Sequence, residues 1–296
     1  MTQVLEVADK RVKLTNLDKV FWPEGGFTKG DLIDYYIKIA PLLLKYLQDR
    51  PVSMVPYPDG IRGHSFYQKN LPRKRPEWLQ AVPLYSSGSK RDINWLVVKD
   101  LPSLIWLANR GSIEVHPWFS RYDTPDHPDY AVFDLDPAQG IDFEEILDLA
   151  LIIRQILNEL GLKSYPKTSG QQGLHVYLPL IRKYNYTRVR AFLERITELI
   201  IKEHPQLATA SWHRNKREGR IYIDYRQNAR GKTLAAPYSL RPTEVAGVSM
   251  PLTWDQIEDK AVRPEDFRLD NLFQFLQEKD PFEEVLSRKQ ELPEFF

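Results

Sequence analysis

The sequence predicts an α/β or α+β fold that presents a functional site on one face of a sheet. Strand-like runs carry acidic residues at 130–137 and 220–225, and helix-like runs separate them. A polar loop bounded by glycines leads into a further strand-like run at 167–178. Strands interleaved with helices are typical of layered mixed folds. The 296 residues can bury a substantial core as one domain or two closely packed lobes, and we expect a single domain over 1–296.

Hydrophobic spacing predicts the elements of the N-terminal half. Strand-prone residues at 4–14 precede a helix from about Lys29 to Leu47, in which apolar residues keep helical spacing. Residues 50–130 hold many prolines and short apolar alternations, which indicate strands and loops, with one helix at 101–109.

Three helices are predicted in the C-terminal half, at 143–160, 187–203 and 271–277. The first is the clearest in the chain, because Asp142 can cap its start and Gly161 can end it in a left-handed turn. Proline and acidic residues become frequent toward the end, so we expect a helical, loop-rich segment over about 252–296.

Composition bounds the class of protein. Apolar residues make up 42% of the chain and aromatic residues 12%, which indicates a folded globule. The chain has no cysteine, so a disulfide framework and a thiolate metal site are excluded, and a cytoplasmic location is expected. No window approaches the roughly 18 apolar residues that span a bilayer, and the start does not resemble a secretory leader. We therefore expect no membrane partner.

The net charge of +1 conceals local basic clusters at 73–75, 214–217 and 226–232. Most such runs are solvated surfaces. These flank the acidic segments in sequence, so we expect some of them to follow a nucleic-acid backbone, with binding that weakens steeply as salt rises.

Asp134 and Asp136 form the most informative pair in the sequence. They lie two residues apart in an otherwise apolar, strand-like run, so they face the same side roughly 7 Å apart. Two such carboxylates repel each other and lose hydration unless a cation bridges them. The pair therefore predicts a divalent-metal site and phosphate chemistry. A strand edge that faces water, or Asp136 capping a helix before Pro137, remains the structural alternative.

Two further segments extend this prediction. Asp224 lies on the opposite face from Ile221 and Ile223 and can complete a three-acid site, or it can simply face solvent. The loop at 168–173 combines Ser169 with two glycines, which permit close backbone approach to a triphosphate. His175 follows and can donate to a phosphate or sugar oxygen, although a glycine hairpin with a satisfied strand histidine is the commoner arrangement.

The order of these motifs resembles the three motifs of the archaeo-eukaryotic primase superfamily. The acid-x-acid strand, the Ser-Gly-x-x-Gly-Leu-His loop and strand, and the late strand aspartate more closely resemble the polymerase domain of bacterial ligase D, the end-joining enzyme. The likeness extends through the segments 14–23, 114–116, 227–228 and 232–241. It implies an α+β primase-polymerase fold, with an RRM-like catalytic sheet, flanking helices and a second β-rich unit.

The resemblance implies roles for individual residues. Asp134, Asp136 and Asp224 would be catalytic and would bind two divalent metal ions, Mn²⁺ or Mg²⁺. The nucleoside triphosphate would lie against a set of small, neutral and basic residues, which are His116, Ser169, Gly170, His175, Arg217, Lys232 and Arg241. Basic donors neutralise a triphosphate, and metal ions assist in-line attack by a 3′-hydroxyl on the α-phosphorus.

The resemblance also implies contacts with DNA. Asn16, Lys19 and Lys29 match positions that bind a 5′-phosphate at a DNA gap or end. The alternative is that Thr28 caps a helix and Lys29 is merely solvated in its first turn. Phe66 and Tyr67 match an aromatic pair that stacks on template bases. Core packing is the competing interpretation of both residues, and for Tyr67 it is the favoured one.

Two departures from the family pattern remove positive charge near the triphosphate. Gln172 stands where a lysine is common, and the segment 54–57 lacks the basic residue usual before the Pro-Asp-Gly turn. Both departures therefore bear on nucleotide affinity, and neither involves the three carboxylates that are expected to bind metal.

The leading functional interpretation is a template-directed DNA/RNA nucleotidyltransferase that fills short gaps at DNA ends in non-homologous end joining, with a preference for ribonucleotides and recognition of a 5′-phosphate. A primase that makes primers de novo and a catalytically decayed DNA-end binding module are the alternatives. A metal-dependent phosphodiesterase is disfavoured, because the triphosphate loop would have no role in it. The sequence contains no ligase or phosphoesterase motif. We therefore expect a free-standing module that works beside Ku and a separately encoded ATP-dependent DNA ligase.

Overall fold

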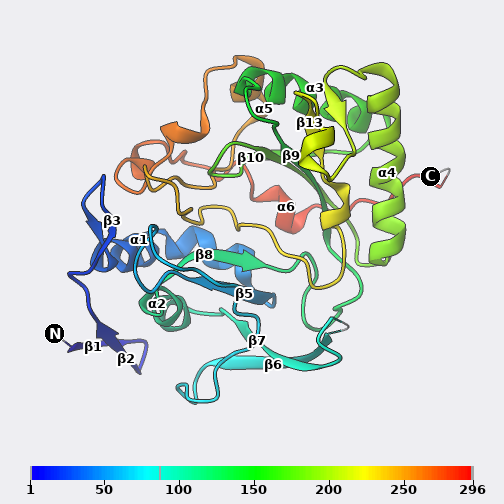
Figure 1. The fold of residues 1–296 in the computed structure, drawn as a ribbon. Coiled ribbons are helices and arrows are strands. Elements are labelled where there is room, and N and C mark those ends of the chain that lie inside the picture. Colours follow the sequence, from blue (N-terminus) through cyan, green and yellow to red (C-terminus); the bar gives the residue numbers. More distant parts are fainter. Residues whose placement is uncertain (1, 87, 295–296) are drawn as a thin grey trace.

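The computed structural model describes residues 2–86 and 88–294 and contains two main sheets, flanked by helices (Figure 1). The first sheet has five strands in the order β10-β11-β9-β13-β12. These strands are β9 (Tyr130–Asp136), β10 (Tyr165–Thr168), β11 (Leu174–Pro179), β12 (Ala208–Thr209) and β13 (Ile221–Ile223). All neighbouring strands are antiparallel except β12 and β13, which are parallel.

Strand β9 lies at the centre of this sheet and carries the acid-x-acid motif at its end. It pairs with β11 on one side, where Asp134 lies opposite His175, and with β13 on the other, where Asp136 lies opposite Tyr222. Residues of β9 up to Leu135 are buried, because the strand is covered on both faces. The register therefore brings three motifs of the sequence to one end of the sheet.

The second sheet has four antiparallel strands in the order β6-β7-β5-β8. They are β5 (Pro51–Pro56), β6 (Gln80–Ser86), β7 (Arg91–Val97) and β8 (Ser112–Pro117). Two small two-stranded sheets precede it, formed by β1 (Thr2–Val7) with β2 (Lys10–Thr15) and by β3 (Val20–Trp22) with β4 (Phe27–Thr28). This part of the molecule corresponds to the predicted second β-rich unit.

Helices α1 (Lys29–Leu47) and α2 (Leu101–Asn109) pack against each other beside the second sheet, and α3 (Phe143–Glu159) and α4 (Tyr186–Glu203) pack beside the first (Figure 1). The four helices match the predicted ranges within one residue at either end. Asp142 caps α3, and Gly161 follows it with a φ of +72°, as predicted.

The C-terminal segment differs from the prediction in detail. The helix predicted at 271–277 is wrong, because only a 3-10 turn at Leu272–Gln274 forms there. Two short helices were not predicted, α5 (Trp254–Glu258) and α6 (Glu284–Ser287). Both are too short to show a helical period in the sequence. Within the described residues, no helix combines the length and the apolar character needed to cross a membrane.

Candidate active site

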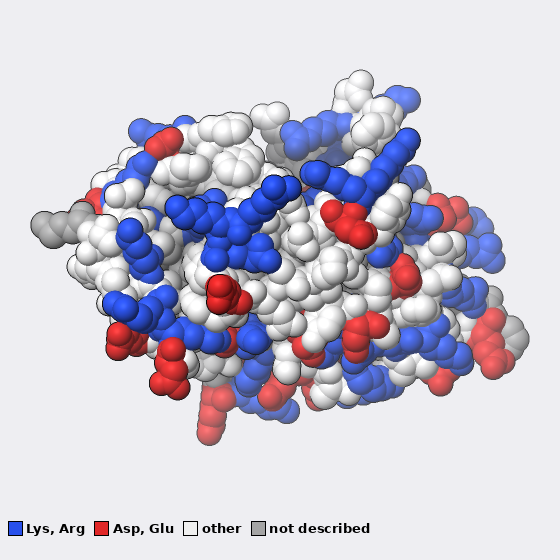
Figure 2. Space-filling model, turned by 90° about the horizontal axis from the view of Figure 1, so that it is seen from below, with Lys and Arg blue, Asp and Glu red and all other residues white. Residues whose placement is uncertain are grey.

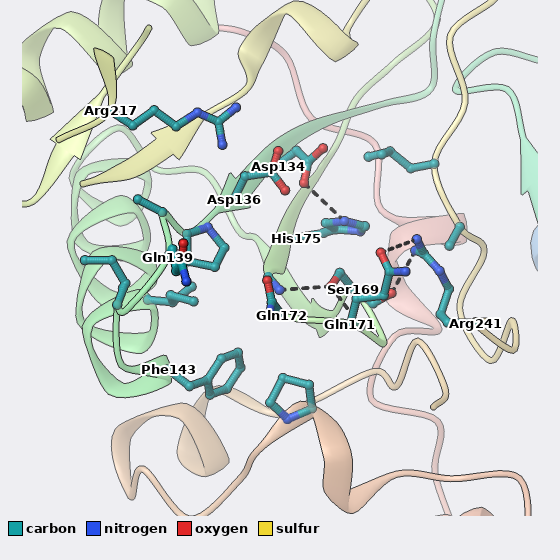
Figure 3. Close-up of a pocket in the computed structure, with 18 of the residues that line it drawn as sticks. Asp134, Asp136, Gln139, Phe143, Ser169, Gln171, Gln172, His175, Arg217 and Arg241 are labelled. Atoms are coloured by element: carbon teal, nitrogen blue, oxygen red, sulfur yellow. Dashed lines mark hydrogen bonds and ion pairs between the residues drawn. The ribbon is translucent and has the colours of Figure 1, made fainter. Parts of the chain in front are cut away.

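A cavity of about 1150 Å³ lies at the end of β9 and receives residues from both main sheets (Figure 3). Its wall combines neighbouring loops with several predicted site residues, among them the exposed aromatic residue Tyr67. The other predicted residues that line it are His116, Asp134, Asp136, Ser169, His175, Arg217 and Arg241. Four arginines face it, namely Arg214, Arg217, Arg241 and Arg263. The cavity is therefore rich in donors for an anionic ligand.

Asp134 and Asp136 lie on the same face of β9, and both line the cavity (Figure 3). Burial and the nearby Asp224 raise the pKa of Asp134 to about 7. Burial and the nearby Asp134 raise the pKa of Asp136 to about 7 as well. Two carboxylates held together out of water favour protonation, or a bound cation that neutralises them.

Asp224 follows β13 and lies beside Asp134 in the cross-strand register. Its backbone N–H donates to the carbonyl of Asp134 at 2.8 Å. Its carboxylate accepts from the backbone N–H of Arg226 at 3.0 Å and caps a 3-10 turn at Tyr225–Gln227. The residue is half-buried and does not line the cavity. The three acids thus lie on neighbouring strands, but Asp224 has a local partner.

The donor chemistry of the two β9 carboxylates suits a hard divalent cation, which prefers oxygen ligands. Their raised pKa values show that the pair lacks sufficient positive charge from the protein alone. Among the residues that the structure describes, no three or more His, Cys, Asp and Glu side chains are arranged to hold a metal ion. The carboxylates therefore fit a metal ion as a pair.

The loop after β10 is held in a tight conformation by Ser169. Its hydroxyl accepts from the backbone N–H groups of Gln171 at 3.1 Å and Gly173 at 3.0 Å. Gly170 has a φ of +76°, which favours glycine, and Gly173 lies so close to β9 that a Cβ would fall 2.4 Å from the carbonyl oxygen of Leu135. The two glycines are needed for this conformation, which confirms the predicted tight turn, while close approach to a triphosphate stays a prediction.

His175 reaches Asp134 across the sheet, with its Nε2 3.2 Å from Oδ1. Burial and the nearby Lys167 and Arg241 hold the pKa of His175 well below its usual range, so the imidazole is neutral at pH 7. Within the part of the chain that the structure describes, its Nδ1 is buried and has no hydrogen-bond partner. Such a group at a cavity wall is available to a ligand.

Arg241 and His116 line the cavity beside the buried carboxylate of Glu114. The Nε of Arg241 lies 2.7 Å from Oε1 of Glu114, and the Nε2 of His116 lies 3.6 Å from the same oxygen. Arg241 also donates to the carbonyl of Ser169 at 2.9 Å and to the side-chain oxygen of Gln171 at 2.8 Å. Among the described residues, neither ring nitrogen of His116 has a hydrogen-bond partner.

Arg217 extends toward Asp134 and Asp136 from the other side of the cavity (Figure 3). Its guanidinium lies over the ring of Tyr222, 4.3 Å from the centroid, which fixes the direction of the side chain. Its Nε is buried and lacks a hydrogen-bond partner within residues 2–86 and 88–294. Lys232, by contrast, is exposed and does not line the cavity, so the structure does not bring it to the other nucleotide candidates.

The three predicted 5′-phosphate residues lie together around the start of α1. The backbone N–H of Lys19 donates to the carbonyl of Asn16 at 3.1 Å, and that of Lys29 donates to the carbonyl of Lys19 at 2.8 Å. The Nζ of Lys29 donates to the carbonyl of Thr15 at 2.6 Å, while the Nζ of Lys19 lies 2.6 Å from Oδ1 of Asp59. Asn16 is exposed and has a φ of +54°.

Thr28 does cap α1 in a capping box with Asp31, as the alternative interpretation of this segment predicted. The other half of that interpretation is wrong, because Lys29 is only 5% exposed and is not merely solvated. Burial, together with the nearby Lys19 and Arg110, lowers the pKa of Lys29 to about 8. A buried cation beside a second basic side chain is suited to an anionic group.

Phe66 and Tyr67 are both exposed: 42% of the surface of Phe66 and 62% of that of Tyr67 is accessible to solvent. Core packing, which the sequence favoured for Tyr67, is therefore wrong. Tyr67 lines the cavity and contacts the ring of His116 edge-on, with centroids 5.8 Å apart. Phe66 stacks on His64 with centroids 6.1 Å apart. Both rings are accessible to a flat partner.

The two departures from the family pattern have different settings. Gln172 lines the cavity, whereas Met54 and Val55 are buried in β5, and the backbone of Met54 bonds to that of Gln68. The four arginines of the cavity supply positive charge that does not depend on either position.

Sequence reasoning missed several groups of this site. No role was predicted for Glu114, Lys167 or Gln171, although all three lie within the motif segments, and Arg214 was expected only as part of a basic cluster along a nucleic-acid backbone. Lys167 is fully buried opposite His175, and its Nζ donates to Ser249. A buried charged residue in an alternating strand was the available signal for Glu114 and Lys167. Their partners lie far away in sequence and could not be identified from it.

Basic side chains also gather on the outer surface. Figure 2 shows Lys and Arg residues grouped on the middle of the face seen from below, while acidic residues are more frequent along its lower edge. The near-neutral net charge of the chain therefore hides an uneven distribution.

Comparison with known proteins identifies the family. Residues 28–282 match the family described as LigD, primase-polymerase domain. The chain is 34% identical over 257 residues to the multifunctional non-homologous end joining protein LigD of Mycolicibacterium smegmatis, which covers 86% of this chain and 33% of that protein. It is 33% identical over 285 residues to the bifunctional LigD of Bacillus subtilis, which covers 96% of this chain and 45% of that protein. The chain thus spans less than half the length of these relatives.

The fold also matches that of a solved member of this family. The polymerase domain of Mycobacterium tuberculosis ligase D, solved in complex with DNA, superposes with a TM-score of 0.86 and 30% sequence identity, over 95% of this chain and 99% of that one. This match confirms the predicted fold class and the predicted family. The chain belongs to the LigD primase-polymerase domain family, a family of nucleotidyltransferases of non-homologous end joining.

Proposed function

We propose that this chain is a template-directed nucleotidyltransferase that fills short gaps at DNA ends. The observation that carries the proposal is the set of buried polar atoms on residues of the cavity wall that have no hydrogen-bond partner among the described residues, namely Nδ1 of His116, Nδ1 of His175 and Nε of Arg217. Buried polar groups are nearly always satisfied in folded proteins. Their convergence beside two acids and four arginines suits a nucleoside triphosphate.

The cavity residues divide into two groups. Asp134 and Asp136 hold a divalent metal ion, Mn²⁺ or Mg²⁺, with Asp224 as the third acid beside them. The metal, when bound, supplies the positive charge that activates the 3′-hydroxyl and stabilises the transferring phosphoryl group. His175 orients Asp134 through its Nε2. In this proposal the reacting end of the nucleotide lies beside these side chains, and the contact of His175 with Asp134 at the end of β9 supports that position.

The second group binds the nucleotide itself. Arg217 and Arg241 approach the cavity from opposite sides, so a triphosphate between them meets a cation at each end (Figure 3). Ser169 and Gly170 keep the loop compact, and His116 and His175 face the sugar. Gln172 can donate an amide N–H to a phosphate but adds no charge, so the arginines carry the electrostatic attraction.

The DNA contacts complete the proposal. Lys19, Lys29 and Asn16 take the 5′-phosphate at the far side of a gap, and Phe66 with Tyr67 stacks on template bases. Acceptance of ribonucleotides, and a role beside Ku and a separate ligase, belong to the proposal through the family. The solved relative with bound DNA supports the DNA partner, since it covers almost the whole of this chain.

The test uses a gapped DNA with a 5′-phosphate, Mn²⁺ and labelled ribo- or deoxynucleoside triphosphates. We expect incorporation by the wild type and its loss in Asp136→Ala. Binding of the gapped DNA without incorporation by either protein would instead identify a decayed end-binding module. Dinucleotide synthesis without a primer, measured in parallel, would assign the chain to de novo priming.

A further inference from the structure

Glu114 is a buried acid directly behind the wall of a cavity that is otherwise built for an anion. It lies on β8 of the four-stranded sheet and is 4% exposed. Burial raises its pKa, but His116, Arg241 and Tyr57 outweigh that effect and lower the pKa to about 2. A carboxylate that remains charged at this position opposes a triphosphate by simple electrostatics. Its presence therefore needs an explanation.

The explanation lies in three contacts. Oε1 of Glu114 lies 2.7 Å from the Nε of Arg241 and 3.6 Å from the Nε2 of His116, and Oε2 accepts from the hydroxyl of Tyr57 at 3.3 Å. Arg241 and His116 both line the cavity, whereas Glu114 itself does not. One carboxylate thus holds two cavity side chains from behind.

Arg241 extends this connection to the other sheet. Its terminal nitrogens donate to the carbonyl of Ser169 and to the side chain of Gln171, in the loop between β10 and β11. Glu114 and Arg241 therefore connect the four-stranded sheet to the nucleotide loop of the five-stranded sheet. A planar guanidinium that is anchored at Nε keeps a fixed direction for its remaining donors.

We infer that Glu114 is a positioning residue, which orients Arg241 and His116 so that two nucleotide-binding groups from different parts of the fold converge. The inference rests on the proposed function, because it concerns the same nucleotide site. Without the carboxylate, the buried Nε of Arg241 loses its charged partner, and the ordering of both side chains is lost before the ligand arrives. Binding then has to supply that ordering and becomes weaker.

A purely electrostatic role leads to the opposite result. Removal of a negative charge beside a triphosphate site strengthens anion binding if the positions of the other groups do not change. Glu114→Gln keeps the size of the side chain and removes the charge. The direction of the change in nucleotide affinity thus distinguishes positioning from simple charge repulsion.

The experiment measures binding of ATP by calorimetry in the presence of Mn²⁺, for the wild type and Glu114→Gln. We expect affinity to fall by about tenfold, the equivalent of 1.4 kcal/mol. The KM for ATP in gap filling should rise by a similar factor, while kcat changes less. Glu258→Gln is the matched control, because it removes an ion pair with Arg154 outside the cavity, and it should bind ATP like the wild type.

A cycle of variants tests whether Glu114 acts through its two partners. In a background that carries Arg241→Ala and His116→Ala, Glu114→Gln should have no further effect on ATP affinity. An undiminished tenfold loss in that background would overturn the inference. Unchanged or tighter binding by Glu114→Gln alone would overturn it as well.

A measurement without nucleotide separates this inference from the proposed function. Burial lowers the pKa of His116, and Glu114 opposes that shift, so Glu114→Gln should lower the His116 pKa further in an NMR titration. An unchanged titration would contradict the positioning role. If the wild type fails to bind ATP, the proposed function fails, and the titration still tests the contact between Glu114 and His116.

Glu114→Asp covers the case in which the glutamine variant does not fold. It keeps the charge but shortens the side chain by one methylene group, so the carboxylate lies farther from Arg241 and His116. We expect ATP affinity between that of the wild type and tenfold below it. Affinity equal to that of the wild type in a folded Glu114→Asp protein would contradict the need for a defined position.

Discussion

His175 and Asp134 face each other across the pairing of β11 with β9, with Nε2 of the imidazole 3.2 Å from Oδ1 of the carboxylate. The pKa of His175 is lowered, so the ring is neutral and carries one proton. With that proton on Nε2, the N–H donates to Asp134, and Nδ1 is an acceptor. The histidine thus orients one of the two acids and presents an acceptor, which suits a sugar hydroxyl better than a phosphate oxygen.

The first prediction follows from this contact. His175→Ala should lower activity, or the apparent affinity for Mn²⁺, by about 10- to 100-fold, the usual cost of losing a group that orients a metal ligand. Gap filling measured against Mn²⁺ concentration checks it. His127→Ala, outside the cavity, is the control and should behave like the wild type. Equal activity of the two variants would contradict the role of His175.

The second prediction concerns the stability of the acid pair. Asp134 and Asp136 both titrate at about 7 in the folded chain, compared with about 4 in an unfolded chain. Between these values the folded state holds more protons, so stability falls as pH rises from about 4 to 7 and then stays level. Asp136→Asn removes one charge of the pair. We expect its free energy of unfolding at pH 7.5 to exceed that of the wild type by about 1–3 kcal/mol.

Denaturant unfolding over this pH range, with EDTA present, is the measurement. The difference between Asp136→Asn and the wild type should shrink toward zero near pH 4, where both carboxyl groups are protonated. A variant less stable than the wild type by the same amount at every pH would contradict strain within the acid pair. Loss of activity together with a gain in stability would show that the pair is maintained for function.

The fold was largely predictable, because its long elements have regular patterns. Helices α1, α3 and α4 combine apolar spacing with cap residues such as Thr28 and Asp142, and both signals are local. The turn at Leu272–Gln274 was predicted as a helix because apolar spacing over so few residues does not distinguish an α-helix from a 3-10 turn. Short elements of this kind depend on tertiary packing.

The site was predictable where its chemistry lies within one segment. Asp134 with Asp136, and Ser169 with its glycines, are adjacent in sequence and remain together in the fold. The contact of Glu114 with Arg241 joins residues 127 positions apart, and no periodicity reports it. The exposure of Tyr67 was also missed, since an aromatic residue carries the same pattern in a core as at a cavity mouth.

The third prediction concerns the basic site at the start of α1. Lys29→Gln should reduce the preference for a 5′-phosphorylated gap over a 5′-hydroxyl gap by roughly 10- to 100-fold, the worth of one hydrogen bond to a charged group. Lys38→Gln, exposed on α1, is the control. Because the pKa of Lys29 is lowered to about 8, the preference of the wild type should also decline between pH 7 and 9. An unchanged preference in Lys29→Gln would place the phosphate elsewhere.

The fourth prediction concerns template stacking. Tyr67→Ala should weaken binding of a gapped DNA by about 1–3 kcal/mol, since its exposed ring is available to a base. Tyr67→Phe retains the ring and should bind nearly as well as the wild type. Fluorescence of a 2-aminopurine base placed in the template opposite the gap gives a direct reading, because stacking quenches it. Equal quenching by the wild type and Tyr67→Ala would remove Tyr67 from the template site.

The last prediction separates backbone strain from steric contact in the nucleotide loop. Gly170 and Gly161 have similar positive φ values, +76° and +72°, so an alanine costs about the same backbone energy at either position, on the order of 1 kcal/mol. At Gly170, however, a Cβ would lie 2.7 Å from both the backbone nitrogen of Ser249 and the Cγ of Arg241, whereas at Gly161 it meets nothing within 4 Å. Gly170→Ala should therefore displace Arg241 and weaken ATP binding, while Gly161→Ala should lower only stability. Calorimetric titration with ATP and thermal unfolding of both variants check this, and equal ATP affinity in the two would show that the loop tolerates the displacement.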